Sequence, residues 1–463
     1  MYDLNDFYKE IKKNGKIGFL ENLLLNPDID LSVGNSYAVK LAAKDGNTEV
    51  MKLLLADPRV DPTVDNNMAI QLASNYGYTE IVKLLLADPR IDPSAYDNIS
   101  IQMAATQGHS NIVKLLLAHP KVDPTADDNW SIRIASEQGH VKILKLLLED
   151  KRADPSADNN AAISHSSRYG HTEIVRLLLA DKRVDPSDRK NCAIIIAALN
   201  GHTEIVKLLL ADPRVDPTTL NNSAIKFASE RGNLGAVKLL LADERVDPSN
   251  DNNYAIMHAA VGKHIETVKC LLKHPKIDPT FRNSVIFAAP LMDGNTELFK
   301  LLLDDKRVDP TIRNSAVIIE AANRGYAKIV ELLLEDKRTD PSADDNNAIR
   351  KAAGKGHTEV VKLLLKDKRV DPSAKDNFAI ILAAGKGHTE IVRLLLKNKK
   401  VDPSAKDNSA IILAAGKGHT EVVKLLLKHS KVDPNAKDNS AHKMASHNGH
   451  VDIIKLLESL KVK

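Results

Sequence analysis

Apolar residues recur along the chain in two short helical patterns that alternate with each other. In the segment 98–107, NISIQMAATQ, the apolar residues Ile101 and Ala105 stand one helical turn apart. In the segment 110–118, SNIVKLLLA, an Ile-Val pair is followed four residues later by a Leu-Leu pair, which again places apolar side chains on one helix face. The patterns predict two short amphipathic helices, one after the other.

The pair of patterns repeats with a constant period. An Asp-Pro dipeptide recurs every 31 residues from Asp61 to Asp433, and a Gly before the second pattern keeps the same spacing with one exception, at Lys263. Such self-similarity is typical of a solenoid, in which each unit buries its apolar face against its neighbours. We predict an all-α helix-turn-helix solenoid of about 14 repeats over residues 31–463, preceded by an irregular capping unit at residues 1–30.

Polar residues and glycines between the patterns predict where the helices begin and end. Gly108 fits the position after a first helix, where a left-handed backbone is required. Asn98 and its equivalents are expected to cap the first helix with their side chains, and Thr79 and its equivalents to begin the second. The Asp-Pro-Ser or Asp-Pro-Thr after each second helix predicts an Asx turn or a type I turn.

The segment 381–396, ILAAGKGHTEIVRLLL, resembles the ankyrin repeat family, whose pattern includes A-A-x-x-G-H-x-x-V-V-x-L-L-L. The likeness recurs along essentially the whole chain. Each unit is about two residues shorter than the family's repeat of about 33 residues, so we expect the family's protruding β-hairpin to be short or absent. This 31-residue variety resembles ankyrin proteins of large DNA viruses of amoebae and some of social amoebae.

The resemblance implies a non-enzymatic scaffold that binds another protein through the concave face of the solenoid and the turns between repeats. Two alternatives are kept open. The first is an adaptor or effector that delivers a host protein to a larger machine. The second is electrostatic binding of nucleic acid by the basic C-terminal repeats, which would show a steep dependence on salt.

Charge and composition narrow these options. The chain has 65 basic and 61 acidic residues, a formal charge of +4, which does not favour a dedicated nucleic-acid binder. The segment from Lys328 onward has 26 basic and 18 acidic residues, a net of +8, which leaves −4 for residues 1–327. An acidic partner or nucleic acid is therefore expected, if at all, at the C-terminal end.

Cysteine usage and hydropathy indicate a compartment. Cys192 and Cys270 are the only cysteines and lie in different repeats, which predicts neither a disulfide framework nor a metal site. The first residues lack the apolar core of a secretory leader, and no apolar run reaches the roughly 18 residues that span a membrane. We expect a cytoplasmic monomer without a membrane partner, located in the host cell if the chain is viral.

Two motifs suggest chemistry but are better explained by structure. Nine units carry His after the repeated Gly, yet successive histidines stand one repeat apart, too far for one metal ion, so we expect them to bind backbone groups of neighbouring turns. The segment AAGKGHTEVVK (352–362) lacks the first Gly and the Ser or Thr of a phosphate-binding loop. We therefore expect no catalytic residue, no metal and no cofactor.

Function is expected where the repeats differ on an exposed face. The two positions before the repeated Gly and the position after the capping Asn vary most, and they include the residue types that most often anchor interfaces. The candidate partner-binding residues are Tyr76, Trp130, Arg133, Gln138, Arg168, Tyr169, Arg231, Lys355, Lys386 and Lys417. The first six group in neighbouring repeats, whereas the three lysines form a basic strip in three nearly identical repeats, 343–427.

One repeat departs from the pattern. Around FRNSVIFAAPLMDGN (281–295), the Ala pair comes two residues early and Pro290 enters the first helix. Proline removes an amide donor and disfavours a helical conformation in the residue before it. We predict a local break in the curvature of the stack at Pro290.

Overall fold

The computed structural model describes residues 31–279 and 286–459, and these divide into two compact units, Met1–Asp247 and Pro248–Lys463. The predicted capping unit at 1–30 lies outside the described residues. The described residues form 28 α-helices and no β-strand, which confirms the all-α helix-turn-helix prediction and agrees with the absence of a β-hairpin. One continuous solenoid from 31 to 463 stays a prediction.

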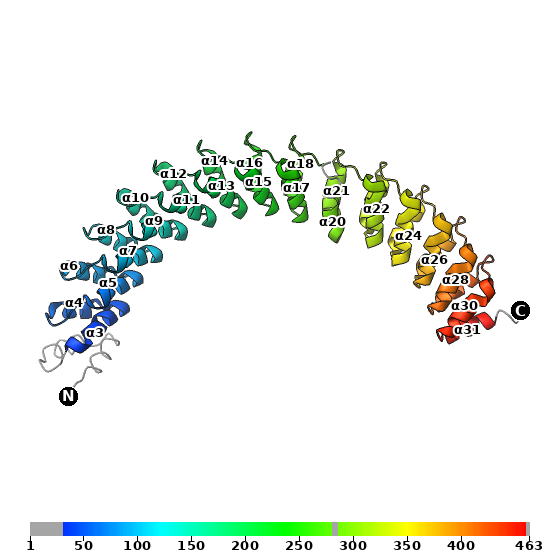
Figure 1. Ribbon diagram of the computed structural model, residues 1–463, viewed down its shortest axis with the longest axis horizontal. Helices are drawn as coiled ribbons and strands as arrows, with labels where there is room; N and C mark the ends of the chain where they lie inside the picture. Colours follow the sequence, from blue (N-terminus) through cyan, green and yellow to red (C-terminus); the bar gives the residue numbers. More distant parts are fainter. Residues whose placement is uncertain (1–30, 280–285, 460–463) are drawn as a thin grey trace, which may run out of the picture. The chain divides into compact units, whose positions relative to one another are not determined.

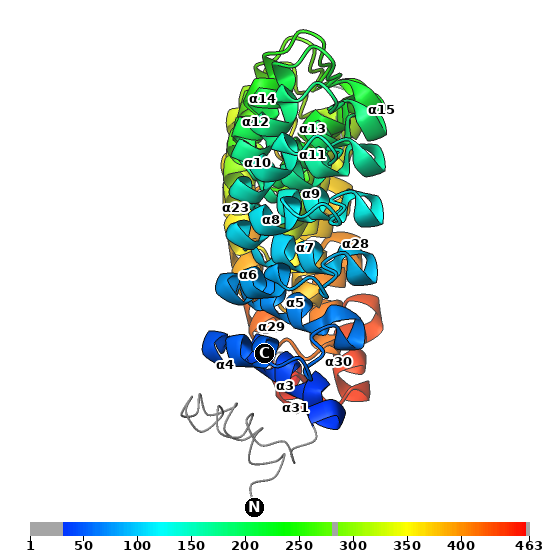
Figure 2. The same cartoon turned by 90° about the vertical axis from the view of Figure 1, so that its left-hand side faces the viewer.

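In the first unit, long first helices alternate with shorter second helices. The first helices are α3 (Leu31–Asp45), α5 (Val64–Tyr76), α7 (Ala95–Gln107), α9 (Ala126–Gln138), α11 (Ala157–Tyr169), α13 (Asp188–Asn200) and α15 (Thr219–Glu230). The second helices are α4 (Thr48–Ala56), α6 (Thr79–Ala87), α8 (Ser110–Leu117), α10 (Val141–Glu149), α12 (Thr172–Ala180), α14 (Thr203–Leu210) and α16 (Leu234–Leu241). Each kind of helix packs on its own kind in the next repeat, which gives the two columns of helices seen in Figure 2.

The second unit repeats this arrangement. Its first helices are α17 (Asn250–Val261), α20 (Ala288–Asp293), α22 (Ile312–Arg324), α24 (Ala343–Lys355), α26 (Ala374–Gly385), α28 (Ala405–Gly416) and α30 (Ala436–His447). Its second helices are α18 (Ile265–Leu272), α21 (Thr296–Asp304), α23 (Ala327–Glu335), α25 (Thr358–Lys366), α27 (Thr389–Leu396), α29 (Thr420–Leu427) and α31 (Val451–Glu458). In Figure 1 the first helices lie on the inner side of the curve that each unit makes.

The core of each repeat comes from the apolar positions of both helices. In the repeat that holds α9 and α10, Ile132 and Ala135 of the first helix and Leu144 and Leu147 of the second have no exposed surface. Burial of one such Leu or Ile side chain contributes about 1.5–3 kcal/mol, and the same positions are buried in repeat after repeat. The predicted amphipathic faces therefore form one apolar seam within each unit.

The turns confirm the predicted roles of Gly and Asp. Gly108 has a left-handed φ of 84° at the end of α7, and Thr79 begins α6. Asp61 accepts hydrogen bonds at its Oδ1 from the backbone amide of Thr63 at 2.9 Å and from its hydroxyl at 2.6 Å, as in an Asx turn. These local bonds recur because the same residues recur.

The predicted cap role of the repeated Asn is wrong. Asn98 has a left-handed φ of 58°, and its Oδ1 accepts a hydrogen bond at 2.8 Å from the backbone amide of Asp123 in the loop that follows. The side chain thus joins a first helix to the loop 25 residues later and does not cap its own helix. The same bond links Asn67 to Asp92, Asn129 to Asp154, Asn160 to Asp185, Asn191 to Asp216, Asn222 to Asp247, Asn253 to Asp278, Asn346 to Asp371, Asn377 to Asp402 and Asn408 to Asp433.

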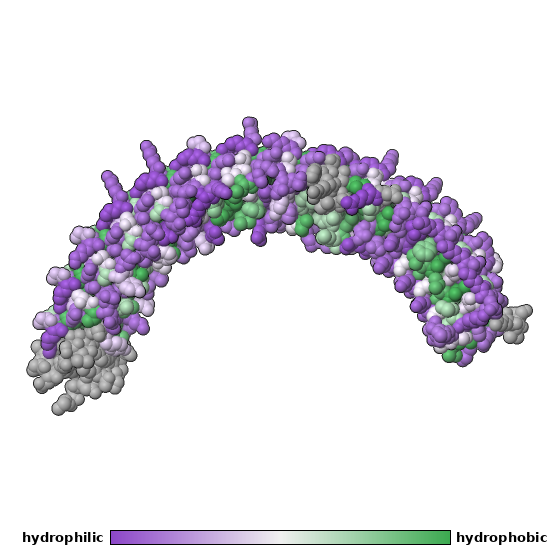
Figure 3. Space-filling model, in the orientation of Figure 1, coloured by the Kyte–Doolittle hydropathy of each residue, from purple (hydrophilic) through white to green (hydrophobic). Residues whose placement is uncertain are grey.

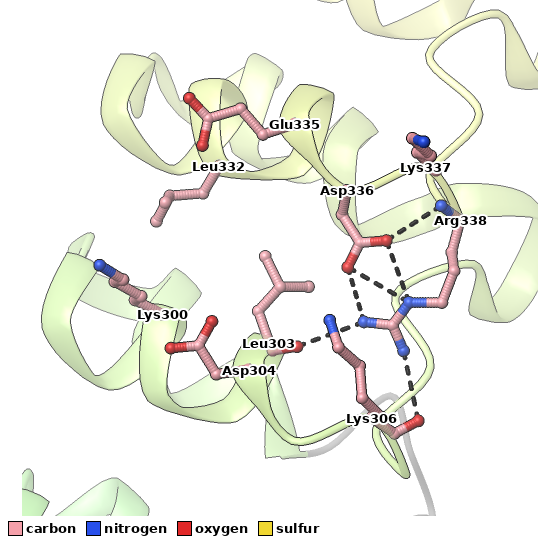
Figure 4. Close-up of a pocket in the computed structure, with 9 residues that line it drawn as sticks. All are labelled: Lys300, Leu303, Asp304, Lys306, Leu332, Glu335, Asp336, Lys337 and Arg338. Atoms are coloured by element: carbon pink, nitrogen blue, oxygen red, sulfur yellow. Dashed lines mark hydrogen bonds and ion pairs between the residues drawn. The ribbon is translucent and has the colours of Figure 1, made fainter.

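An Asp-Arg pair in the outer loops is a second link between repeats. Arg338 binds Asp336 at 2.6 Å (Figure 4). It also donates from Nη1 to the carbonyl oxygen of Val308 at 2.7 Å, in the loop of the preceding repeat. A planar guanidinium can make both contacts at once because its donors point in fixed directions. The same contact to a carbonyl 30 residues earlier is made by Arg90, Arg152, Arg183, Arg214, Arg245, Arg307 and Arg369.

Pro290 is the third residue of α20 and is buried. In the first turn of a helix a missing amide hydrogen costs little, because that amide has no partner within the helix. The helix therefore accommodates the proline. Residues 280–285, which precede this helix, lie outside the described residues, and the break in curvature at Pro290 stays a prediction.

Candidate functional site

The inner surface of the first unit is built from equivalent positions on consecutive first helices. Residues 31 apart in sequence fill the same place on neighbouring helices, and residues four apart share a helix face. One row, which we call row A, follows the turn Asn and holds Met68, Ile99, Trp130, Ala161 and Cys192. The second, row B, lies one helical turn further on and holds Leu72, Met103, Ile134, His165, Ile196 and Phe227.

Most side chains of the two rows are partly exposed. They are apolar except for His165 in row B and the buried Ser223, which continues row A on α15. Ala161 and Ile134 are buried, Ile134 with 8% of its surface exposed. Figure 3 shows that the molecular surface seen from the side is mostly hydrophilic and that apolar residues gather in separate patches. Apolar side chains at an interface centre, with a polar rim, are typical of protein-binding surfaces.

Trp130 and Arg133 lie together on α9. The guanidinium carbon of Arg133 is 5.4 Å from the centre of the Trp130 ring, within the range of a cation–π contact. Arg133 also donates to the carbonyl oxygens of Asp127 and Asp128, both at 3.0 Å. The equivalent residue of other repeats also donates to the carbonyl oxygen five residues before it, as seen for Gln71, Gln102 and Arg350. Part of the role of Arg133 is therefore to stabilise the turn at the start of α9.

Tyrosines occupy the rim at the last turn of two first helices. Tyr76 is 46% exposed and Tyr169 is 53% exposed. Each ring lies next to the aromatic residue two positions later, with centres 6.2 Å apart for Tyr76 and Tyr78 and 6.4 Å apart for Tyr169 and His171. The neighbouring ring limits the freedom of an exposed tyrosine, which lowers the entropy lost when a partner binds.

The other predicted residues of this unit are also exposed. Gln138 and Arg168 lie at the ends of α9 and α11, and Arg231 follows α15. These six residues lie on three of the four consecutive first helices from α5 to α11, and α7 carries none of them: Tyr76, Trp130, Arg133, Gln138, Arg168 and Tyr169. Their role in binding stays a prediction.

A polar cluster at His165 is the feature that the sequence analysis missed. The Nδ1 atom of His165 lies 3.1 Å from Oε2 of Glu137 on the neighbouring helix α9. Burial lowers the pKa of His165; Glu137 opposes this shift, and the arginines at 168, 189 and 133 add to it. The sequence does contain a sign of this cluster. When the repeats are aligned, His165 stands at a position where the adjoining repeats have Ile134 and Ile196.

The predicted basic strip lies in the second unit. Lys355, Lys386 and Lys417 are exposed at the ends of consecutive first helices, and none of the three has an ion-pair partner in the part of the chain that the structure describes. Leu413, 39% exposed, and Met444, 40% exposed, accompany them on α28 and α30. The strip is therefore basic with apolar neighbours.

Outer grooves between second helices follow from the repeat geometry. One groove of about 590 Å³ lies in the second unit between α21 and α23 and is lined by Lys300, Leu303, Lys306, Leu332 and Arg338 among others (Figure 4). A groove of about 480 Å³ lies at the equivalent positions of α4 and α6 in the first unit. Because such grooves occur at equivalent positions in different repeats, they result from the way second helices pack and do not mark a specific binding site.

Six of the repeated histidines contact backbone carbonyl oxygens, as predicted. The Nε2 atom of His109 lies 3.1 Å from the carbonyl oxygen of Asn75, near the end of the preceding first helix. Equivalent contacts of 2.8–3.2 Å are made by His140, His171, His202, His357 and His450. Residues 31–279 and 286–459 contain no group of three or more His, Cys, Asp or Glu placed to hold a metal ion.

A family model for ankyrin repeats in three copies matches overlapping segments that together run from residue 11 to residue 462. The matched segments are 11–97, 96–159, 132–221, 194–283, 225–314, 285–376, 317–407 and 380–462. The chain belongs to the ankyrin repeat family. Ankyrin repeats are generally protein–protein interaction modules, and the family is typically non-enzymatic.

A search of curated proteins finds no match to this ankyrin-repeat protein. Its likeness to the short repeats of viruses of amoebae stays a prediction from the sequence. Among the described residues, no helix is both long enough and apolar enough to cross a membrane.

Proposed function

We propose that this ankyrin-repeat protein is a scaffold that binds another protein through the inner surface of its first unit, centred on α5 to α11. The observation that supports the proposal is the concentration there of exposed Tyr76 and Tyr169, the Trp130–Arg133 pair and two apolar rows. Trp, Tyr and Arg are the residues that most often dominate binding energy at interfaces. Binding requires no catalytic residue and no cofactor.

A capture experiment with a triple variant tests the proposal. The purified chain is immobilised and exposed to a lysate at low and at physiological salt, in parallel with the variant Tyr76→Ala, Trp130→Ala, Tyr169→Ala. We expect a protein that is retained at physiological salt by the unchanged chain and lost by the variant. Loss of one such anchor typically costs about 2 kcal/mol or more of binding energy.

A matched control separates the inner surface from exposed apolar residues in general. Tyr96, 70% exposed, and Leu220, 52% exposed, belong to the left-handed stretches at the start of α7 and α15 and lie outside rows A and B. The double variant Tyr96→Ala, Leu220→Ala is expected to capture the same protein as the unchanged chain. Equal capture by the triple variant and the unchanged chain contradicts the proposal.

A second candidate function belongs to the basic strip of the second unit. Lys355, Lys386 and Lys417 have the same position in three consecutive repeats and no ion-pair partner among the described residues, which favours an acidic partner. Attraction by exposed lysines weakens as salt increases, because counterions screen the charges. If capture depends on these lysines but does not weaken as the salt concentration rises, this function is contradicted. If the strip captures nucleic acid and no acidic protein, its partner is nucleic acid.

A further inference from the structure

His165 is a polar exception in row B. The equivalent residues on the helices before and after α11 are Ile134 and Ile196. Its Nδ1 atom is buried and, although it lies 3.1 Å from Glu137, it has no hydrogen bond of good geometry to any described residue. A half-buried imidazole without a hydrogen bond weakens the fold compared with an isoleucine in this position, since a buried polar atom that loses water needs a partner.

The charges around His165 leave one cation available to a ligand. Arg133 and Arg189 both pair with Asp158, at 3.2 Å and 2.8 Å. Arg168, one helical turn after His165 on α11, is exposed and its guanidinium has no ion-pair partner within the described residues. Glu137, on α9, is the only carboxylate among the groups that shift the pKa of His165.

Apolar side chains extend on both sides of this pair. On α5, α7 and α9 the rows present Met68, Leu72, Ile99, Met103 and Trp130, and on α13 and α15 they present Cys192, Ile196 and Phe227. Packed helices lie about 8–10 Å apart, so the five helices from α5 to α13 span roughly 40 Å. An extended peptide of about 12 residues covers this length at about 3.3 Å for each residue.

We propose that the inner surface of the first unit binds an extended polypeptide segment in which apolar side chains flank a single carboxylate, and that Arg168 and His165 receive this carboxylate. The proposal rests on the proposed function, because it names the partner chemistry of the same surface. Arg168 supplies the unpaired charge, and His165, one helical turn earlier on α11, supplies a hydrogen bond donor. The apolar rows supply the remaining contacts.

Binding of this carboxylate is coupled to a proton. Burial and the three nearby arginines lower the pKa of His165 in the free protein, against the opposite effect of Glu137. A carboxylate beside the imidazole favours its charged form and raises its pKa in the complex. The affinity therefore increases as the pH falls through the pKa of the bound state, and the complex takes up a proton.

The probe is a library of random peptides of about 12 residues, displayed on phage and selected on the full chain at about pH 6, near the ordinary pKa of histidine. We expect enriched peptides to contain apolar residues around one Asp or Glu. A selected peptide and its Glu→Gln or Asp→Asn form are then compared by titration calorimetry in two buffers of different ionisation enthalpy. The neutral form is expected to bind about tenfold more weakly, as for the loss of one charged hydrogen bond, and without proton uptake.

Two variants assign the effect to residues. Arg168→Gln is expected to remove the preference for the acidic peptide, whereas Arg176→Gln, the same change at an exposed site on α12, leaves it intact. His165→Ile restores an apolar row B and is expected to abolish proton uptake while neutral peptides still bind. Retained proton uptake in His165→Ile overturns the assignment to this residue.

The outcomes separate this inference from the proposed function. The carboxylate site is overturned if the selected peptides need Trp130 for binding but contain no acidic residue. It is also overturned if the acidic and neutral forms of a peptide bind equally well. Both outcomes leave the binding surface in place. If none of the selected peptides needs Trp130 for binding, the proposed function and this inference are overturned together.

Discussion

The imidazole of His109 covers Gly77 of the preceding repeat so closely that a β-carbon on Gly77 would lie 2.6 Å from Cε1 of the ring. Gly77 also has a left-handed φ of 84°. A close side-chain contact over the glycine recurs in both units, with the rings of Tyr78 and Tyr326 in place of histidine at Gly46 and Gly294 and the amide of Asn233 at Gly201. His109 therefore both covers a neighbouring glycine and binds the end of a neighbouring helix, as do its equivalents His140, His171, His202, His357 and His450.

Gly77→Ala is expected to destabilise the first unit by more than the cost of a left-handed alanine, which is about 1–2 kcal/mol. The control is Gly449→Ala, because Gly449 has a similar φ of 73° but no atom within 4 Å of the added carbon. Urea unfolding of both variants measures the difference. Equal losses of stability contradict a tight contact between His109 and Gly77.

Asn129→Ala is expected to destabilise the stack by about 1–2 kcal/mol, because the backbone amide of Asp154 loses its acceptor. Asn439 has the same left-handed conformation, with φ of 62°, but makes no such bond within the described residues. Asn439→Ala therefore removes only the backbone preference of Asn for this conformation. If chemical unfolding shows the same loss in both variants, the link between repeats contributes nothing.

The Asp-Arg pairs predict a dependence of stability on acid. The hydrogen bond from Arg152 lowers the pKa of Asp150 in the folded chain, against the opposing effect of burial. The pair therefore stabilises the fold above the carboxyl's unfolded pKa of about 3.9, and this contribution disappears as the pH falls through the lower folded pKa.

Asp150→Asn is thus expected to lower stability at neutral pH and to flatten the decline below about pH 4. Glu149→Gln, at the exposed neighbouring residue, makes the same change in net charge and serves as control. The measurement is the midpoint of urea unfolding, determined across this pH range for both variants and for the unchanged chain. A decline in Asp150→Asn as steep as in the unchanged chain contradicts the assignment.

Leu220→Asn is expected to stabilise the first unit by about 0.5–1 kcal/mol. Leu220 is 52% exposed and has a left-handed φ of 54°, at a position where several other repeats place Asp, such as Asp127 and Asp158. Asn tolerates this conformation better than leucine because its side chain is short and can bond to the nearby backbone. An unchanged or lower melting temperature would show that the left-handed turn stores no strain at this position.

The helices could be predicted from the sequence because their apolar periodicity repeats with every unit. Ile112 and Leu116 are buried as expected, and Gly108 ends its helix in the left-handed conformation. These features depend on neighbours within a few residues, which the sequence displays directly. Because the sequence repeats every 31 residues, an assignment that is correct for one repeat applies to the equivalent residues of the others.

The role of the repeated Asn could not be predicted by the same reasoning. A local rule assigns Asn98 to its own helix, but its partner is the amide of Asp123, 25 residues later. Three consecutive left-handed residues, such as Tyr96, Asp97 and Asn98, also have no counterpart in simple propensities. Only the packing of one repeat on the next determines this geometry.

The candidate site was predictable in part. Exposure of Tyr76 and Tyr169 follows from their place before the repeated Gly. The contact of His165 with Glu137 joins two repeats, and its meaning depends on the isoleucines at the same register in the adjoining helices. Binding by these residues remains a prediction that requires a partner.

Trp130 offers the most direct test, because it is the only tryptophan of the chain and lies in row A. The experiment follows its fluorescence emission while the captured protein, or a selected peptide, is titrated into the unchanged chain. Burial of the indole in an interface is expected to shift the emission to shorter wavelength, with a saturation curve that matches the affinity measured by calorimetry. Tight binding in calorimetry with no change in Trp130 emission would contradict a binding surface on the inner side of the first unit.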